Sequence, residues 1–211
     1  MLITEIYASI QGETQYAGLP CILVRTTGCD LRCSYCDTGY AFSGGKEMSV
    51  EEIVMEVEKL GPRFVTLTGG EPMLQAEIVS LAERLVAEDF QVAVETSGAH
   101  SVAQLPPSVI RIMDIKTPGS GVGERNLWEA VDALSPKDAI KFVLCDEADY
   151  RWAAEVVRNR KLAGKAEILF SPATGTLDPR DLVGWILRDR LPVRLNLQLH
   201  KYIWGTEERG V

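Results

Sequence analysis

The sequence lacks any long apolar run, and this absence limits where the protein can reside. No apolar stretch in its 211 residues approaches the roughly 20 that a membrane-spanning helix needs. The N-terminal segment MLITEIYASIQGETQ also lacks the basic start of a secretory signal. We therefore expect a protein of the cytoplasm, with no membrane partner.

Positive charge is scarce relative to negative charge. Lys and Arg total 22 against 30 Asp and Glu, which gives a net charge of −8. This balance argues against nucleic-acid binding through bulk electrostatics, but it allows a small anionic substrate held by one or two arginines. Apolar residues make up 46%, enough for a sizeable core. With no repeat or low-complexity segment, the length predicts one domain over residues 1–211.

Cysteine is also infrequent, and its placement is informative. Three of the five cysteines, Cys29, Cys33 and Cys36, lie in one short loop, GCDLRCSYCDT (28–38). This is not the pattern of a disulfide scaffold, and it fits a reducing cytosol. The C-x3-C-x2-C spacing offers three thiolates, whereas a cubane iron–sulfur cluster usually takes four. The loop therefore predicts a cluster with one iron left open for a substrate or cofactor.

A zinc site is the alternative for this loop. Structural zinc usually takes four Cys or His ligands, arranged as two paired knuckles. Cys21 and Cys145 fall in predicted strands without a C-x2-C partner, and we expect both to be buried small hydrophobes. His100 and His200 are distant in sequence, although folding could bring one close. The spacing favours a cluster, and a non-enzymatic, zinc-stabilised binding domain is the alternative that elemental analysis would reveal.

Short β-rich runs alternate with helical patterns along the chain. Their β-branched content and brevity predict strands at 21–27, 63–68, 90–95, 110–115, 139–144, 166–171 and 193–199. Helices are predicted at 49–60, 75–88, 148–162 and 179–189, with a short one at 124–134, and Ser49 with Glu52 forms a capping box. This alternation predicts parallel strands with helical crossovers. We expect an α/β fold, a partial, open (β/α) TIM-like barrel of about six parallel strands.

Polar residues follow several of the predicted strands. The cysteine loop follows the first strand, GGEP (69–72) the second, and Glu95–Ser97 close the third. Polar residues at the carboxyl ends of parallel strands are the active-face pattern of a (β/α) barrel. The two glycines of GGEP let the backbone approach a ligand and expose its N–H groups, although alone such a turn is more often only a tight loop.

The combination of C-x3-C-x2-C with GGEP resembles the radical S-adenosylmethionine (SAM) superfamily. The resemblance implies that the methionine amine and carboxylate of SAM chelate the open iron of a [4Fe–4S] cluster. An electron from the reduced cluster then cleaves SAM to a 5′-deoxyadenosyl radical, which abstracts a hydrogen atom from the substrate. The resemblance fixes a reaction class and leaves the substrate open.

Further segments are similar to the 7-carboxy-7-deazaguanine synthase family. They are EIYASIQGET (5–14), Arg25, Cys36-Asp37-Thr38, ETSG (95–98), DIKTPGSG (114–121) and QLHK (198–201). The resemblance implies ring contraction of 6-carboxy-5,6,7,8-tetrahydropterin with loss of ammonia, dependence on Mg²⁺, a homodimer and a reductant protein such as a flavodoxin. The product feeds queuosine-type tRNA modification, so no tRNA contact is implied. The competing hypothesis is a radical SAM activase that makes a glycyl radical on a partner protein.

The family match assigns metal and cofactor positions residue by residue. Cys29, Cys33 and Cys36 would hold the cluster. Thr38 matches the Mg²⁺ ligand, although the residue alone would more often cap a turn. Glu95, at a strand end, is predicted to bind a ribose hydroxyl. The SAM-contacting positions implied are Tyr35, Asp37, Gly70, Glu95, Ser97, Asp114, Ile115, Lys116, Ser171, Pro172, Ala173 and Thr174.

The same match assigns substrate positions. Arg25 is the candidate partner of the substrate carboxylate, because a guanidinium binds carboxylates bidentately; the alternative is a surface salt bridge. His200 is open between a structural role and a place near the substrate. The implied set is Ile10, Gln11, Gly12, Glu13, Arg25, Thr68, His200 and, through its terminal carboxylate, Val211. The cysteine loop is compact and the C-terminal tail long for this family, which leaves the pocket wall and the role of Val211 open.

Overall fold

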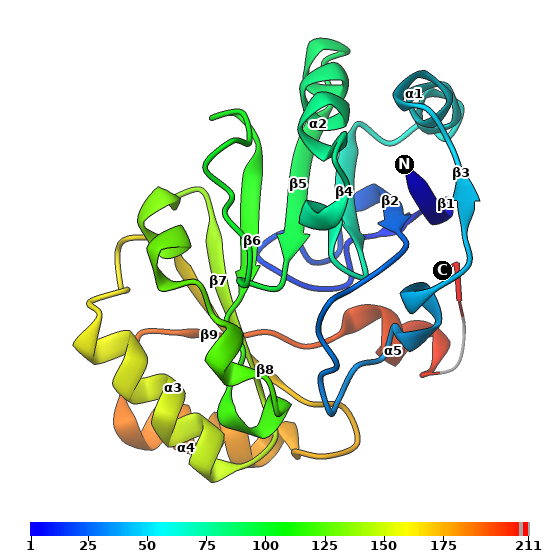
Figure 1. The fold of residues 1–211 in the computed structure, drawn as a ribbon. Coiled ribbons are helices and arrows are strands. Elements are labelled where there is room, and N and C mark those ends of the chain that lie inside the picture. The colour runs from blue at the N-terminus through cyan, green and yellow to red at the C-terminus, as the bar shows by residue number, and fades with distance from the viewer. Residues whose placement is uncertain (207–208, 211) are drawn as a thin grey trace.

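The strands form one open, largely parallel sheet (Figure 1). The computed structural model describes residues 1–206 and 209–210. Across these residues the sheet has nine strands in the order β3-β1-β2-β4-β5-β6-β7-β8-β9. Their bounds are β1 Leu2–Ile10, β2 Pro20–Thr26, β3 Lys46–Glu47, β4 Phe64–Gly69, β5 Gln91–Thr96, β6 Ile110–Asp114, β7 Ala139–Leu144, β8 Glu167–Pro172 and β9 Arg194–Leu195. β1 is antiparallel to β2 and β3, and every other pairing is parallel. Among the described residues the two edge strands, β3 and β9, do not pair with each other, so the barrel is partial, as predicted.

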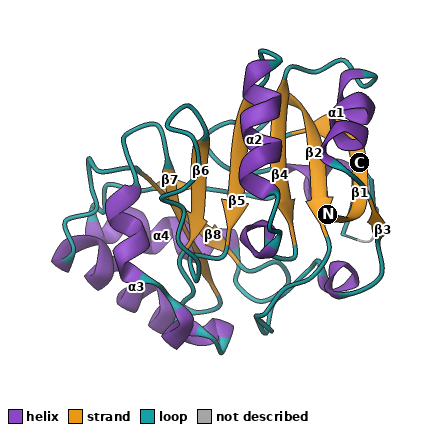
Figure 2. Ribbon diagram, turned by 45° about the horizontal axis from the view of Figure 1, so that its top comes forward, coloured by secondary structure: helices purple, strands orange, loops and turns teal. Residues whose placement is uncertain are grey.

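Helices cover the outer face of the sheet (Figure 2). They are α1 Val50–Glu58, α2 Ile78–Ala87, α3 Glu147–Asn159 and α4 Pro179–Asp189. A short α5, Leu199–Trp204, lies on the other side, where His200 and Lys201 line the cavity. Short 3-10 turns lie at Gly39–Phe42, Pro72–Leu74, Pro118–Ser120, Gly123–Arg125 and Trp128–Ala133. Ser49 and Glu52 form the predicted capping box of α1. No helix of the described residues is long and apolar enough to cross a membrane.

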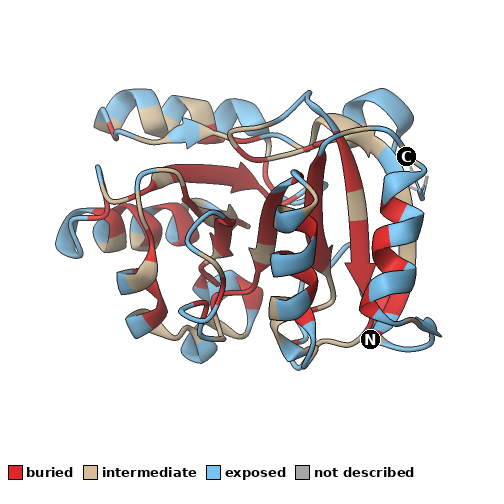
Figure 3. Ribbon diagram, turned by 90° about the horizontal axis from the view of Figure 1, so that it is seen from above, coloured by how far each residue is buried: buried red, intermediate tan, exposed pale blue. Residues whose placement is uncertain are grey.

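The two faces of the strands carry different side chains. Along β4, Val65 and Leu67 point outward into the large core shared with α1 to α4, as alternation along a strand requires. Phe64 points inward and joins a small apolar cluster with Cys21 and Leu169. In Figure 3 the central strands are mostly buried, while α1, α2 and α3 are buried on one side and exposed on the other. The inner face above the small cluster is polar, and this is where the candidate site lies.

The structure differs from the sequence predictions at four places. The predicted strand 193–199 is shorter in the structure, where β9 ends at Leu195. The next residue, Asn196, still donates its backbone N–H to the Phe170 carbonyl at 2.9 Å, but its side chain bonds Ser171 and the chain turns out of the sheet there. The chain then enters α5, which was not predicted. Residues 124–134 form two 3-10 turns in place of one helix. The strands β1 and β3 were missed because antiparallel pairs fall outside the β–α alternation.

Candidate active site

One cavity of about 820 Å³ opens at the carboxyl ends of the parallel strands. It gathers nearly all of the predicted site residues: Ile10, Gln11, Gly12, Glu13, Arg25, Cys29, Cys33, Tyr35, Cys36, Asp37, Thr38, Thr68, Gly70, Glu95, Ser97, Asp114, Lys116, Ser171, Pro172, Ala173, Thr174 and His200. Ile115 is different, because its side chain is fully buried in the outer core. Val211 lies outside the described residues.

Backbone hydrogen bonds shape the cysteine loop at the cavity rim. Gly28 N–H donates to the Ala41 carbonyl at 2.8 Å, and Cys36 N–H donates to the Cys33 carbonyl at 3.2 Å. Cys29 and Cys33 are half-buried and Cys36 is exposed. Burial raises the pKa of the Cys29 and Cys33 thiols. A bound cation would reverse that shift, because coordination deprotonates a thiol outright.

The GGEP turn packs directly against the cysteine loop. A Cβ at Gly70 would lie 2.1 Å from the Gly28 carbonyl oxygen, so glycine is required for this approach. Glu71 N–H donates to the same carbonyl at 2.8 Å. The buried Glu71 carboxylate accepts from Thr96 Oγ1 at 2.8 Å and from Ser97 N–H at 2.7 Å. Glu71 therefore joins the ends of β4 and β5 and has a structural role.

Three residues that line the cavity each have one polar atom that is buried without a hydrogen-bond partner among the described residues. These atoms are Tyr35 Oη, Ser97 Oγ and Asp114 Oδ1. Buried polar groups in folded proteins are normally hydrogen-bonded, so unpaired ones that line a cavity indicate a polar ligand. The cavity thus offers thiolates beside unpaired hydroxyl and carboxylate groups. This donor set fits a cluster with a bound amino acid and nucleoside such as SAM.

The described residues place no fourth Cys or His ligand in a preassembled metal site with the cysteine loop. Within residues 1–206 and 209–210, no three His, Cys, Asp or Glu side chains converge on a single ion. His100 does approach the cysteine loop, but its Nε2 lies 3.1 Å from Asp30 Oδ1. Cys21 is buried as predicted. Cys145 is only half-buried and follows β7, so its predicted place inside a strand is wrong.

Thr38 does not cap the turn that follows it. It occupies the N-cap position of Gly39–Phe42 without a side-chain hydrogen bond to the turn. Its hydroxyl lies 3.8 Å from the sulfur of Cys36. The hydroxyl is therefore directed to the cysteine side of the cavity.

Deeper in the cavity, the side chain of Gln11 contacts the carboxyl group of Glu95 and the backbone of Glu13. Gln11 Nε2 donates to Thr66 Oγ1 at 3.0 Å and to Glu95 Oε1 at 3.1 Å, and Gln11 Oε1 accepts from Glu13 N–H at 3.1 Å. Thr68 Oγ1 donates to the second oxygen of Glu95 at 3.3 Å. The predicted cofactor residue Glu95 is thus held by the predicted substrate residues Gln11 and Thr68.

Lys141, which sequence reasoning missed, lies between these groups. Its Nζ is 2.9 Å from Glu13 Oε2 and 3.7 Å from Asp114 Oδ2, while Lys116 Nζ is 3.0 Å from Asp114 Oδ2. Burial opposes ionisation of Glu13, but the Lys141 ammonium outweighs it and lowers the Glu13 pKa. Burial raises the pKa of Glu95, with the Glu13 charge adding to that rise. The available signal was a single cation in the apolar strand AIKFVL.

Helix α5 closes one side of the cavity. Gln198 Nε2 donates to Glu13 Oε1 at 2.8 Å and to Asp37 Oδ2 at 3.0 Å, and Lys201 pairs with Asp37. Burial opposes ionisation of Asp37, but the Lys201 charge prevails and lowers its pKa to about 2. His200 packs against Gly12, where an added Cβ would lie 2.0 Å from its Nδ1. Burial lowers the pKa of His200, so the ring is favoured in its neutral form.

Arg25 points into the cavity and is only 9% exposed, so it is not a surface salt bridge. Its Nε donates to Glu5 Oε1 at 2.7 Å, and its Nη2 is 3.5 Å from Tyr7 Oη. Tyr40 Oη donates to the same oxygen of Glu5 at 2.9 Å. Arg209, from the C-terminal tail, stacks over the Tyr40 ring at 4.2 Å. The tail therefore reaches the Arg25 side of the cavity.

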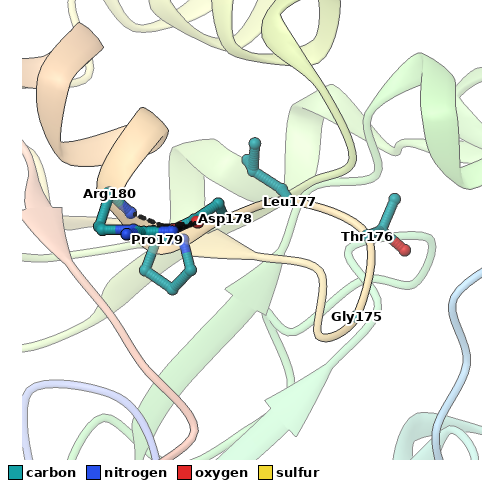
Figure 4. Close-up of a pocket in the computed structure, with 6 residues that line it drawn as sticks. All are labelled: Gly175, Thr176, Leu177, Asp178, Pro179 and Arg180. Carbon is teal, nitrogen blue, oxygen red and sulfur yellow. Dashed lines mark hydrogen bonds and ion pairs between the residues drawn. The ribbon is translucent and has the colours of Figure 1, made fainter.

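A separate depression of about 420 Å³ lies at the loop before α4 (Figure 4). Its only charged side chains among the described residues are Asp178 and Arg180, which pair with each other, and Asp178 also caps α4. The two charged side chains of this depression are thus paired within the loop itself. The large cavity is the better candidate.

Comparison with known proteins gives a consistent result. The sequence profile of the radical SAM superfamily matches residues 23–113. The 7-carboxy-7-deazaguanine synthase of Koribacter versatilis (strain Ellin345) is 50% identical, covering 100% of each chain. That of Chlorobaculum tepidum is 45% identical, covering 99% of this chain and 96% of the relative.

Solved structures share the fold. The crystal structure of QueE from Escherichia coli matches with a TM-score of 0.78 at 23% identity, covering 93% of each chain. Streptococcus suis SuiB bound to S-adenosylmethionine matches with a TM-score of 0.59 at 13% identity, covering 89% of this chain and 53% of SuiB. At these identities the likeness extends to the fold alone.

Proposed function

The chain belongs to the 7-carboxy-7-deazaguanine synthase family of radical SAM enzymes, and we propose that it converts 6-carboxy-5,6,7,8-tetrahydropterin to 7-carboxy-7-deazaguanine with loss of ammonia. It is then a carbon–nitrogen lyase of 7-deazapurine (queuosine) biosynthesis. The observation that carries the proposal is a single cavity lined by both the cysteine loop and the polar residues Gln11, Arg25 and His200. The glycyl-radical activase has less support, because relatives with the synthase name match the full chain.

The cavity divides into two parts. The cofactor half contains the cysteine loop with Ser97, Asp114 and Lys116, and the substrate half contains Gln11, Glu13, Arg25 and His200. Glu95, expected from the sequence to bind a ribose of SAM, is now assigned to the substrate half, because Gln11 and Thr68 hold its carboxyl group. The [4Fe–4S] cluster and SAM supply the radical that removes a hydrogen atom from the substrate. In the cofactor half, the three cysteine thiolates would hold the cluster, and Ser97 and Asp114, each with a polar atom that lacks a partner among the described residues, would hydrogen-bond to SAM.

In the substrate half, each polar group has a task that its surroundings support. The Arg25 guanidinium takes the pterin carboxylate, a bidentate charge pair that exchanges with part of its contact to Glu5. The carboxylates of Glu13 and Glu95 accept from the N–H donors of the pterin ring. His200, favoured as the neutral ring, offers one donor and one acceptor. Thr38 is the proposed Mg²⁺ ligand, with the remaining oxygens from substrate and water.

Four further points complete the proposal. The chain acts as a single domain over residues 1–211, in the cytoplasm, as a homodimer. Electrons come from a reductant protein such as a flavodoxin. The net charge of −8 supports a small-molecule substrate over a nucleic acid. A size-exclusion measurement with light scattering tests the dimer directly.

The test of the activity is anaerobic reconstitution followed by turnover. We expect about four irons per chain, the number that a cubane cluster requires. Incubation with SAM, dithionite, Mg²⁺ and the carboxypterin is expected to give the deazaguanine product. A fully reconstituted sample that makes no product contradicts the assignment, and protein that binds zinc without iron or sulfide supports the structural alternative. Omitting Mg²⁺ from the same assay tests the magnesium site separately.

A further inference from the structure

We propose that Lys141 is a positioning residue, which holds the substrate half of the cavity in place against the cofactor half. The inference rests on the proposed function, because it assigns to the Lys141–Glu13 ion pair the task of keeping the carboxypterin aligned for that reaction. The residues that carry it are Lys141 on β7, Glu13 in the loop after β1, and Asp114 at the end of β6.

The backbone fixes where Lys141 lies. Asp114 and Lys141 are direct partners in the parallel pairing of β6 with β7, so their side chains project from the same face of the sheet. Ile115 N–H donates to the Lys141 carbonyl at 2.8 Å and keeps the two strand ends together. The ammonium therefore starts from a rigid position and reaches Glu13 Oε2 at 2.9 Å.

The two carboxylates differ in how much they depend on this ammonium. Asp114 has a second cation, because Lys116 Nζ lies 3.0 Å from it, closer than Lys141 at 3.7 Å. Glu13 pairs with Lys141, and its other carboxylate oxygen accepts from the neutral amide of Gln198. Loss of Lys141 therefore leaves Asp114 paired but leaves Glu13 as a buried charge without an adjacent cation. The substrate half is affected and the cofactor half is retained.

A displaced Glu13 changes the outcome of each radical event. The cluster and SAM remain able to react, since their residues keep their contacts. The carboxypterin is no longer held at the distance that hydrogen-atom transfer requires. SAM cleavage then continues without ring contraction, and 5′-deoxyadenosine accumulates in excess over product. Substitution of a residue needed only for folding would instead lower 5′-deoxyadenosine and the deazaguanine product together.

The test compares Lys141→Met and Lys141→Arg with Lys137→Met, a control that removes a lysine before β7 and outside the cavity. Binding is measured by fluorescence titration with 6-carboxypterin, the stable oxidised analogue, independently of turnover. Lys141→Met is expected to weaken this binding about 100-fold, the scale for removing one partner of a buried charge pair, and to raise the ratio of 5′-deoxyadenosine to product. The KM for SAM is expected to stay unchanged. Lys141→Arg keeps the charge and is expected to restore part of the affinity, and Lys137→Met behaves as wild type.

Each remaining outcome decides the inference. If wild-type protein makes product and Lys141→Met binds 6-carboxypterin as tightly as wild type, the inference is wrong while the proposed function stands. If wild-type protein makes no product, the proposed function fails first. If Lys141→Met does not fold, the double variant Glu13→Gln/Lys141→Met buries neither charge. It is expected to bind 6-carboxypterin as Glu13→Gln alone does, and a further loss in the double variant overturns the inference.

Discussion

The two halves of the cavity are built in different ways. The cofactor half is built around one contiguous loop, residues 28–38, which is folded back on itself by backbone hydrogen bonds such as Cys36 N–H to the Cys33 carbonyl. Ser97, Asp114 and Lys116 join this loop from the ends of β5 and β6. The substrate half is assembled from side chains far apart in sequence: Glu13 meets Lys141 across 128 positions and Gln198 across 185. A local motif fixes the first half, and tertiary packing fixes the second.

This difference predicts how each half responds to substitution. The cofactor half depends on backbone geometry and on thiolates that nothing else replaces, so changes there abolish the chemistry. The substrate half depends on paired charges and shared hydrogen bonds, so changes there weaken binding by degrees. Four substitutions test the contrast, in order of decreasing expected effect.

The first substitution is Cys33→Ala, which removes one cluster ligand. Product formation and SAM cleavage are both expected to fall to the level of a protein-free control, because three thiolates are already one fewer than a cluster usually has. Iron and sulfide analysis after anaerobic reconstitution checks the cause. The matched control is Cys21→Ala, at a buried cysteine in the small inner apolar cluster away from the loop. Normal iron content and turnover in Cys33→Ala would contradict the division into halves.

The second substitution is Arg25→Ala in the substrate half. The KM for the carboxypterin is expected to rise about 100-fold, the scale for losing one partner of a buried charge pair. SAM cleavage is expected to persist, because Arg25 contacts Glu5 and Tyr7 and not the cysteine loop. Steady-state kinetics with each substrate varied in turn separates the two effects. Arg194→Ala, at an exposed arginine on β9, is the control. If Arg25→Ala abolished SAM cleavage as Cys33→Ala is expected to do, the division of the cavity into two halves would be wrong.

The third substitution, Gly70→Ala, tests the contact between the GGEP turn and the cysteine loop. The new Cβ would lie 2.1 Å from the Gly28 carbonyl oxygen, so the backbone must shift. We expect a loss of about 1–3 kcal/mol in the free energy of unfolding, the usual cost of overpacking, together with lower iron occupancy. Gly184→Ala is the opposite control, because Gly184 lies within α4 and an added Cβ there meets nothing within 4 Å. It is expected to stabilise the protein by about 0.5–1 kcal/mol; equal effects of the two changes would refute the close-approach argument.

The same contrast explains how far the sequence could predict the structure. The strands of the parallel sheet were predicted because each is a short β-branched run, and the cysteine loop because its spacing is specific. Strand β1 was missed because it pairs antiparallel with β2. Helix α5 was missed because its first residue, Leu199, donates its N–H to the Gly12 carbonyl at 2.7 Å, a long-range contact that no local sequence pattern reveals.

Within the site, the residues that were predicted lie in recognisable motifs. Lys141 was missed because the sequence of its own strand does not indicate its partners. Glu13 belongs to the loop after β1 and Asp114 to β6. Glu95 was predicted from its strand-end position to contact a ribose, and only the fold places it beside Gln11 and Thr68. The identity of a charged residue was visible in the sequence, and its pairing was not.

The fourth substitution, His200→Gln, has the smallest expected effect and tests the substrate half through the pH dependence of the free energy of unfolding. Burial lowers the pKa of His200 below its ordinary 6.5, so the unfolded chain binds more protons at this residue than the folded protein does. The stability gained by keeping the ring neutral is therefore fully present above pH 6.5 and is lost as the pH falls through the lowered pKa. In urea unfolding at pH 7.5 and pH 5.5, His200→Gln is expected to lose less stability on acidification than wild type, by under about 1 kcal/mol because the ring is partly solvated. His100→Gln, on the cysteine-loop side, is the control. The opposite sign, with wild type losing less than His200→Gln, would mean that the nearby carboxylates of Glu13 and Asp37 hold the ring protonated, and that the substrate half is organised around a cation at this position as well as at Lys141.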